Sequence, residues 1–338
     1  MITKKNELPK ITFVIPTLDA EKYLPLCLGS IRSQVYPKGK IEIIVSDGGS
    51  KDKTLQIARK YGTQIVNNPK VIHEHGKSLG IKNATGDIIF YTDSDNILSS
   101  RLWLKRMTRP YMENENIIGF LPQTVPYKKS NPLDRYLGYL FTDPFTWFVY
   151  GQAANPRDYI NLYLPLKKNK NYVLFKFPKN NPPLFGLAQG VGTSRRFKRT
   201  SSVAADDMLS GIKLIEENGI VAYVPQAGVY HLHVTGFKNY VSKYSWRTRN
   251  NLTQTFKGMG IVNRTKYFSR IRKIRMYLFI PYSLSIIFPL IDGIKLSIKY
   301  KDFVMLYHVP STFLMGLVII KETVKFFIWK DTTMGSYK

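Results

Sequence analysis

The sequence predicts an α/β fold whose first half is a mainly parallel, doubly wound sheet. Short apolar segments with strand character alternate with segments of helical apolar spacing through the first 125 residues. The connections between them are short, and such alternation is typical of a parallel sheet with helices on both faces. A chain of 338 residues with 44% hydrophobic content can also bury a large core.

The elements of this half follow one another in a regular order. Strands are expected at 11–15, 41–45, 64–66 and 87–91, and helices at 21–35, 51–61 and 77–84. Pro16 stops the first strand, and the second runs into Asp47 and two glycines. Residues of this kind end strands and begin turns, so these polar segments should lie at one rim of the sheet.

The stretch "GDIIFYTDSDN" places two carboxylates, Asp93 and Asp95, directly after the fourth apolar strand. Residues two apart on an extended chain point to the same side, where two negative charges repel unless a cation lies between them. Mg²⁺ and similar hard cations bind one or two carboxylates together with substrate phosphates. The alternative is a polar turn with a helix cap at Asp95 or Ser99.

The charge balance restricts the partners of this chain. Fifty Lys and Arg outnumber 23 Asp and Glu, giving a formal net charge of +27 and a pI near 9.9. This excess suits a nucleic acid, an anionic membrane surface or a phosphorylated substrate. The single cysteine, Cys27, cannot form an internal disulfide and is expected in a helix core. The first ten residues have no apolar leader, so a cytoplasmic location is expected for the soluble part.

Four segments together resemble the family 2 glycosyltransferases of GT-A fold. They occur in the family's order and at about its spacing, well over 10–126 and more loosely over 185–250. The segments are "FVIPTLDAEKYLPLCLGSIRSQ", "IEIIVSDGGSKDKT", "HGKSLGIKNATGDIIFYTDSDN" and "AADDM". The resemblance implies a sugar-nucleotide donor, Mg²⁺ or Mn²⁺ at Asp93 and Asp95, and inversion at the anomeric carbon. It also implies a GT-A fold for the first half.

The resemblance also suggests donor-binding residues. Pro16 and Thr17 could form one wall of a base pocket, and Asp47 could accept a hydrogen bond from a uracil or guanine N–H. Lys77 is expected to open a helix whose cation and free N–H groups favour a phosphate. Most relatives place an arginine before the position of Asn83, where this chain has Lys82. Lysine lacks the bidentate fork of arginine, which weakens the case for a diphosphate clamp there.

The second half should supply the base and the acceptor side. The segment "AADDM" resembles the family's acceptor-side motif, so Asp207 is expected as the general base and Asp206 as its neighbour. Two aspartates at the start of a helix are also favoured by the helix dipole. His231 follows the "Y-x-P-x-A" pattern after an expected strand and turn, and it matches a histidine near the metal in relatives. Arg247 and Arg249 are expected near phosphate.

Two further stretches are less regular. Residues 127–185 are rich in Tyr, Phe and Pro, and either form a buried subdomain or expose aromatic rings to a lipid-linked or carbohydrate acceptor. The apolar runs 276–291 and 303–320 follow a basic cluster and contain Pro281, Pro289 and Pro310. A short transmembrane hairpin, interfacial or re-entrant helices and a buried helical pair are all compatible with them.

The expected organisation is a nucleotide-sugar half over 1–126, an acceptor half over 127–260 and a membrane-associated region over 261–338. The sequence thus predicts a metal-dependent inverting glycosyltransferase at the cytoplasmic face of the cell membrane. Its partners would be a UDP- or GDP-sugar and a polyprenyl-linked or other glycan acceptor. The chain lacks the Gln-x-x-Arg-Trp motif of processive synthases, so single-sugar addition is expected. A nucleotidyltransferase and an inactive sugar- or nucleic-acid-binding protein are the alternatives. No nucleic-acid partner is expected, because the densest basic cluster adjoins an apolar run.

Overall fold

A computed structural model describes residues 7–179, 182–197, 207–232, 234–255 and 261–334. The chain divides into two compact units. The sheet unit comprises 1–125 and 156–231, and the helical unit comprises 126–155 and 232–338. The chain therefore leaves the sheet unit once, for α5 and α6, before it returns and finally leaves again after His231.

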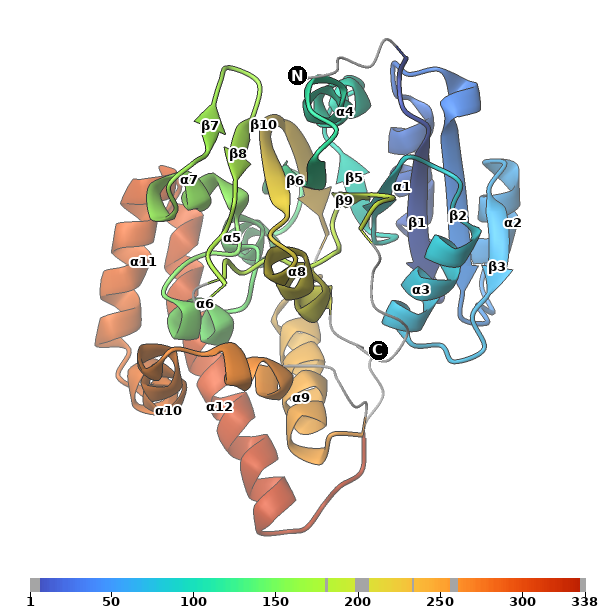
Figure 1. The fold of residues 1–338 in the computed structure, drawn as a ribbon. Coiled ribbons are helices and arrows are strands. Elements are labelled where there is room, and N and C mark those ends of the chain that lie inside the picture. Colours follow the sequence, from blue (N-terminus) through green and yellow to red (C-terminus); the bar gives the residue numbers. More distant parts are fainter. Residues whose placement is uncertain (1–6, 180–181, 198–206, 233, 256–260, 335–338) are drawn as a thin grey trace. The chain divides into compact units, whose positions relative to one another are not determined.

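The sheet unit contains a mixed ten-stranded sheet (Figure 1). Its order is β3-β2-β1-β4-β9-β6-β10-β8-β7, and β5 pairs with β10 off this path. The strands are β1 (Ile11–Thr17), β2 (Ile41–Asp47), β3 (Gln64–Asn67), β4 (Ile88–Tyr91), β5 (Asn96–Leu98), β6 (Ile117–Thr124), β7 (Lys167–Lys168), β8 (Val173–Phe175), β9 (Val191–Ser194) and β10 (Ile220–His231). The helices are α1 (Leu24–Arg32), α2 (Thr54–Lys60), α3 (His73–Asn83), α4 (Trp103–Glu113), α7 (Tyr159–Leu162) and α8 (Asp207–Glu216).

The expected α/β fold is confirmed. β1 pairs in parallel with both β2 and β4, and β2 pairs in parallel with β3. β9 then runs antiparallel between β4 and β6, so the complete sheet is mixed. The first four strands were visible in the sequence because each is a short apolar run that ends at a turn residue. Cys27 lies in the core of α1, as expected.

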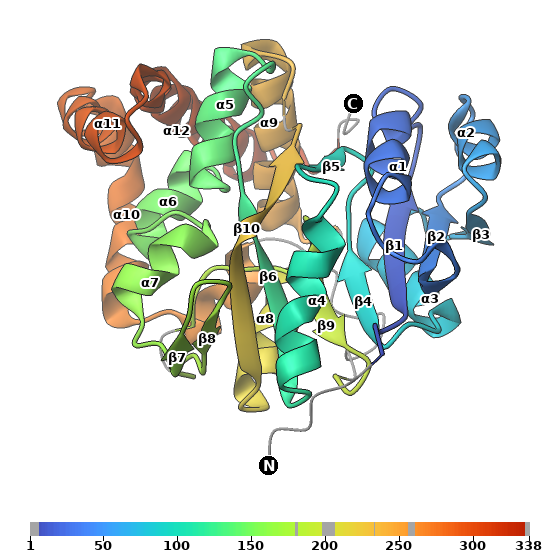
Figure 2. The same ribbon diagram turned by 90° about the horizontal axis from the view of Figure 1, so that it is seen from above.

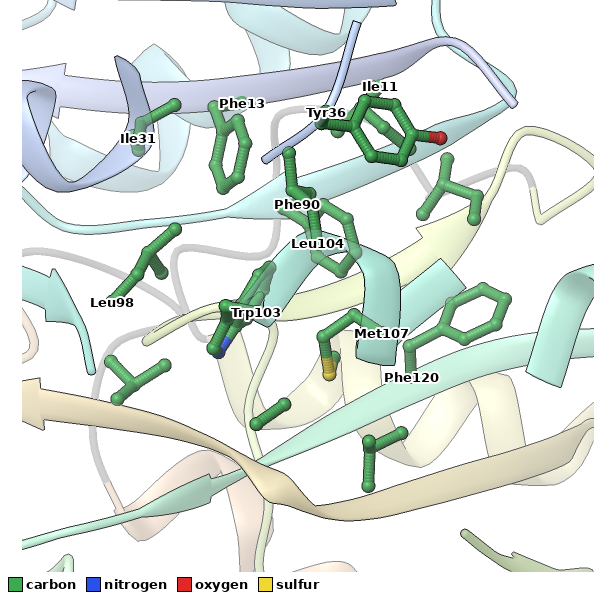
Figure 3. Close-up of a cluster of buried hydrophobic side chains, with 14 of the residues drawn as sticks. Ile11, Phe13, Ile31, Tyr36, Phe90, Leu98, Trp103, Leu104, Met107 and Phe120 are labelled. Atoms are coloured by element: carbon green, nitrogen blue, oxygen red, sulfur yellow. The ribbon is translucent and has the colours of Figure 1, made fainter. Parts of the chain in front are cut away.

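Alternate residues of β1 supply two separate cores. Phe13 packs with Phe90 and with Trp103 of α4 on the face that α1 also covers (Figure 3). Val14 and Tyr91 belong to the other core, on the face covered by α3 and α8 (Figure 2). Because side chains alternate along a strand, a fully buried strand must carry apolar residues at nearly every position. This explains why the segment Ile11 to Ile15 is apolar at every position except Thr12.

Two local expectations are wrong. The turn expected within "YVPQAG" is instead a bulge, because β10 continues from Ile220 to His231 with a register shift between Val224 and Gly228. A bulge accommodates Pro225 without ending the strand. The helix expected at Lys77 begins at His73, so Lys77 lies in its second turn and not at its N-terminus.

The helical unit is built from α5 (Pro132–Leu140), α6 (Pro144–Tyr150), α9 (Phe237–Thr253), α10 (Arg270–Leu284), α11 (Ile287–Tyr300) and α12 (His308–Phe327). Short 3₁₀ segments precede α10 and α12, at Ile261–Tyr267 and Phe303–Tyr307. Tyr136 and Leu137 of α5 are buried with Phe279 of α10 and Met315 of α12. The aromatic segment after residue 127 is therefore largely a buried core.

One helical segment in the described part of the chain, Phe303–Phe327, is long and apolar enough to cross a membrane. The bent pair α10 and α11 passes the same test only when its two arms are counted together, and they meet at 98°. Core helices of soluble proteins share these properties. The first apolar run is thus broken at Ser285 and Ile286, where Ile286 has a φ of 58°.

We expect Gly86→Ala to destabilise the sheet unit. A Cβ at Gly86 would lie 2.6 Å from the backbone nitrogen of Thr12 and 2.9 Å from the carbonyl carbon of Ile11. Neither backbone atom can move without disturbing β1, so the free energy of unfolding should fall by about 1–3 kcal/mol. Chemical denaturation measures this change. Gly39→Ala is the control, since nothing lies within 4 Å of its Cβ position; equal stability of the two variants would contradict the expectation.

Candidate functional site

Asp93 and Asp95 lie in the short loop between β4 and β5, at the carboxyl end of a buried parallel strand. β5 pairs antiparallel with the end of β10, and this register sets Asn96 opposite His231. The pairing brings a histidine far along the chain next to the two aspartates. The open rim of an α/β sheet, outside the carboxyl ends of its strands, is where such folds bind ligands.

Asn96 fixes the conformation of this loop. Its side-chain oxygen accepts a hydrogen bond from the backbone N–H of Asp93 at 2.9 Å. Its side-chain nitrogen donates to Asp95 Oδ1 at 3.2 Å. Asn96 is completely buried, so replacing it would leave the loop without these bonds in a place that water does not reach.

Asp93, Asp95 and His231 form a group that could hold a metal ion. One ligand atom from each residue lies within 4.8 Å of the other two, and His231 Nε2 is 3.3 Å from Asp95 Oδ1. Two carboxylate oxygens and one imidazole nitrogen suit Mg²⁺ through the oxygens and Mn²⁺ through the complete set. The donor set therefore fits the cation expected from the sequence, and several coordination positions would remain for substrate.

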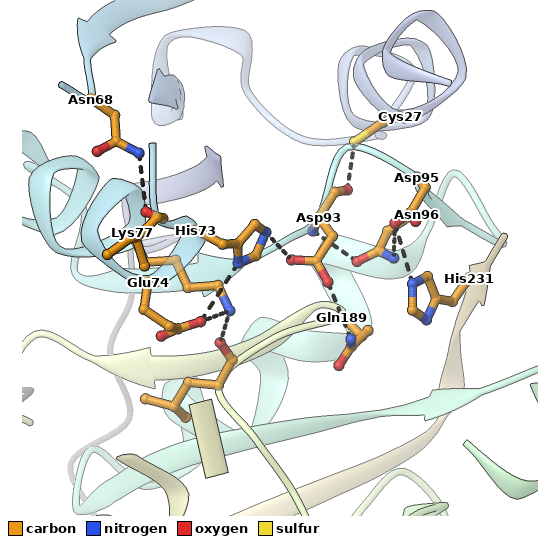
Figure 4. Close-up of polar contacts among 12 residues, drawn as sticks. Cys27, Asn68, His73, Glu74, Lys77, Asp93, Asp95, Asn96, Gln189 and His231 are labelled. Carbon is orange, nitrogen blue, oxygen red and sulfur yellow. Dashed lines mark hydrogen bonds and ion pairs between the residues drawn. The ribbon is translucent and has the colours of Figure 1, made fainter. Parts of the chain in front are cut away.

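Two residues that sequence reasoning missed hold Asp93 in place (Figure 4). His73 Nε2 lies 3.1 Å from Asp93 Oδ1, and Gln189 donates to Asp93 Oδ2 at 3.1 Å. His73 is the first residue of α3, and Gln189 belongs to the loop before β9. The segment "HEHGKS" could have signalled His73 as a polar helix start. No local signal identifies Gln189, because its position depends on β9 pairing with β4.

These contacts shift the pKa values of Asp93 and His73. Burial would raise the pKa of Asp93, but the nearby charges of His73 and Lys77 outweigh it and hold that pKa well below its usual value. Desolvation and the Lys77 charge act against a proton on His73, yet Asp93 and Glu74 raise its pKa to about 9. Without a bound cation, these contacts therefore favour the Asp93 carboxylate and the His73 imidazolium over their neutral forms.

Lys77 does not lie free for a phosphate. Its side chain is 1% exposed, and its ammonium donates to Glu74 Oε1 at 2.8 Å and to the carbonyl of Leu187 at 3.0 Å. The cation thus ties α3 to the loop that carries Gln189. A direct contact between Lys77 and a nucleotide sugar would require these hydrogen bonds to break.

Asp47 organises the loop that follows β2. Its carboxylate accepts hydrogen bonds from Thr17 Oγ1, from the backbone N–H groups of Gly49 and Ser50, and from Ser50 Oγ, at 2.5–2.9 Å. Four donors use most of the capacity of a carboxylate. Thr17, Asp47 and the end of β1 that contains Pro16 are therefore brought together at one rim, as the sequence predicts.

The remaining expected site residues belong to other segments of the chain. Asn83 is exposed and donates to the carbonyl of Leu79 in its own helix. Arg247 and Arg249 belong to the helical unit, where Arg247 lies over the ring of Tyr244 and Arg249 is buried against Glu322. Asp207 begins α8, with its side chain outside the described part, and Asp206 lies outside the described residues.

Removing the Lys77 charge should destabilise the fold. Lys77→Met leaves the Glu74 carboxylate buried without its cation, so the free energy of unfolding should fall by about 3 kcal/mol or more. Adding Glu74→Gln should recover part of the loss. Lys82→Met is the control, because Lys82 is exposed on the same helix. Denaturant unfolding of the three variants tests this, and equal stability of Lys77→Met and Lys82→Met would contradict it.

Comparisons with known proteins agree with this architecture. Residues 12–166 match the model of "Glycosyl transferase family 2". Glycosyltransferase AglE of Haloferax volcanii is 32% identical over 107 residues, which are 30% of this chain and 35% of that protein. A dolichyl N-acetyl-α-D-glucosaminyl phosphate 3-β-D-2,3-diacetamido-2,3-dideoxy-β-D-glucuronosyltransferase of Methanococcus voltae is 39% identical over 89 residues, 24% of this chain and 28% of that protein. The chain thus spans about a third of the length of these relatives.

A solved structure extends the similarity to most of the fold. The mannosyltransferase PcManGT from Pyrobaculum calidifontis, determined with GDP-Man and Mn²⁺, matches 96% of this chain and 89% of its own. The TM-score is 0.52 at 15% sequence identity, so this likeness concerns the fold alone. The family match and the sequence relatives show that the chain contains a glycosyltransferase family 2 domain.

Proposed function

We propose that the chain is a metal-dependent, inverting glycosyltransferase that moves one sugar from a UDP- or GDP-sugar to an acceptor hydroxyl or phosphate. The observation that carries the proposal is the group of Asp93, Asp95 and His231, whose ligand atoms lie within 4.8 Å at the rim of a family 2 domain. Nucleotide-sugar transfer makes use of such a cluster because a diphosphate leaving group must depart. A sugar-binding module, in contrast, has no need of the general base expected at Asp207.

The donor side combines this cluster with the adjacent rim. Asp93 and Asp95 would hold Mg²⁺ or Mn²⁺ with His231, and the bound cation would stabilise the negative charge of the leaving diphosphate. His73 and Gln189 orient Asp93, and Asn96 orients Asp95. Pro16, Thr17 and Asp47 lie at the ends of neighbouring parallel strands, where a nucleotide base would bind. The Mn²⁺ and GDP-Man present in the mannosyltransferase structure support this assignment.

The acceptor side requires a base. The acceptor hydroxyl must lose its proton as it attacks the anomeric carbon, and Asp207 at the start of α8 is proposed to accept it. Asp206 would support Asp207 or bind the acceptor. A base opposite the leaving diphosphate gives in-line displacement, so one transfer inverts the configuration and no covalent sugar–enzyme bond forms.

The proposed acceptor is a polyprenyl phosphate or a polyprenyl-linked glycan at the cytoplasmic face of the cell membrane. The relative from Methanococcus voltae is named for a dolichyl-linked sugar phosphate, which supports this class. The net charge of +27 also favours an anionic surface that presents phosphate groups. A donor site by itself has no need of the long apolar segments after residue 270.

Metal binding should depend on Asp95. Asp95→Asn keeps the size of the side chain but removes one anionic ligand, so Mn²⁺ affinity should fall at least about tenfold. Isothermal titration with Mn²⁺ alone measures this independently of catalysis. Glu217→Gln is the control, because it removes an exposed carboxylate in the loop after α8. Equal Mn²⁺ affinity of both variants, or full transfer activity in excess EDTA, would refute the metal assignment.

The base is tested by Asp207→Asn, which is nearly isosteric but cannot accept the acceptor proton. Transfer from the active UDP- or GDP-sugar to a polyprenyl-linked acceptor should fall about 10²-fold or more, while donor affinity persists. Radiolabelled lipid extraction measures the product. Near wild-type transfer by this variant would make Asp206 the next candidate. Failure of the unmodified chain to form any lipid-linked sugar across the donor panel would refute the acceptor class.

A further inference from the structure

The surface of α11 has an unusual distribution of apolar residues. Ile287, Ile291, Ile294 and Ile298 recur at helical spacing, which is the pattern of a helix that buries one face in a core. All four are exposed, and Ile298 is 73% exposed. The opposite face of α11, with Leu296 and Tyr300, is the one buried in the helical unit. The apolar stripe of α11 therefore faces outward.

α10 and the bend also expose large apolar residues, and two of them are aromatic. They are Ile271, Ile274, Tyr277, Leu278, Leu284, Ile286, Phe288 and Leu290. Exposed apolar patches of this extent are uncommon on monomeric soluble domains and indicate an interaction site. We define the exposed apolar residues of 271–298 as the apolar arch.

Cations flank the apolar arch. Residues 270–301 contain seven Lys and Arg and one Asp. Arg272 faces inward, over the ring of Tyr150 at 4.4 Å. The exposed cations on or beside the two helices are Arg270, Lys273, Lys295, Lys299 and Lys301. An apolar stripe bordered by cations is typical of helices that lie in the headgroup region of an anionic bilayer.

The geometry of the two helices disfavours a membrane crossing. α10 has 15 residues and α11 has 14, and they meet at 98°. Each arm is therefore only about 21–23 Å long, against about 30 Å for the hydrocarbon core of a bilayer. A bent pair that exposes apolar residues on both arms can instead lie along the interface.

Helix α12 is more apolar than α10 and α11, but it packs against other helices of the helical unit. It packs on α9, α10 and α11, and α9 is a helix with several Lys and Arg residues. Arg249 of α9 and Glu322 of α12 form a buried ion pair with N–O contacts of 2.5–2.8 Å. A helix that carries a buried ion pair with a polar neighbour is unsuited to contact lipid on all sides.

We propose that the helical unit binds an anionic bilayer through the apolar arch and does not cross it. A second copy of this chain is a weaker candidate for the same surface, because two such arches would bring like charges together. The inference deepens the proposed membrane location but rests on the exposed surface alone. It can therefore fail while the proposed transfer reaction holds, and the reverse is also true.

The test is co-sedimentation of the purified full chain with vesicles of phosphatidylcholine, with and without 30% phosphatidylglycerol. Binding should require phosphatidylglycerol, weaken in high salt, and be released by alkaline carbonate as expected for a protein that does not span. Ile294→Glu/Ile298→Glu should reduce vesicle affinity at least about tenfold. Leu164→Glu/Leu166→Glu is the matched control, since both leucines are exposed in the sheet unit and the charge change is equal.

A second pair of variants tests how much the lysine charges contribute to vesicle binding. Lys295→Gln/Lys299→Gln should reduce affinity for the anionic vesicles about tenfold or more, while Lys167→Gln/Lys168→Gln on β7 should not. Vesicle binding that is unaffected by both arch variants overturns the proposal. Retention in the bilayer after carbonate also overturns it, because the chain would then span. Failure to bind vesicles, together with a dimer that Ile294→Glu/Ile298→Glu dissociates, would assign the surface to a second copy.

Discussion

The antiparallel pairing of β5 with β10 determines where the candidate ligands lie. β5 has only three residues, yet its register sets Asn96 opposite His231 and so brings together segments separated by more than 130 positions. Asn96 then uses both ends of its amide to hold the loop of Asp93 and Asp95. Without this pairing, His231 would not lie beside the two carboxylates as a third candidate ligand. The bulge in β10 matters for the same reason, because it lets the strand follow β6 and still reach β5.

A second layer of contacts determines the charge state of the site. Asp93 lies between His73 and Gln189, and Lys77 fastens the His73 helix to the loop of Gln189 through Glu74 and Leu187. The buried lysine thus acts on the carboxylate through its field and through the loop it anchors. A cation that binds at the site would therefore contact a carboxylate whose orientation is already fixed. This lowers the free-energy cost of bringing the ligands together.

Much of this arrangement could be predicted from local sequence. The parallel strands are apolar runs bounded by turn residues, and the two aspartates follow one of them at a spacing that points both to one side. Four ordered segments carried the family resemblance, and the match over 12–166 confirms it for the part of the chain that holds the first three. The roles of Gln189 and Asn96 were not predictable, because each depends on a strand pairing with distant residues. The segment "HEHGKS" signals a helix start at His73 but not its contact with Asp93. Lys77 was expected at a helix N-terminus, whereas it lies inside α3 and forms a buried ion pair with Glu74.

The sheet unit ends at His231, and the chain passes into the helical unit at the next residue. One candidate metal ligand is thus joined to the helical unit by a single peptide bond. Any equilibrium of the helical unit that changes the position of His231 would therefore be thermodynamically linked to cation binding. Each would then change the equilibrium constant of the other by the same factor.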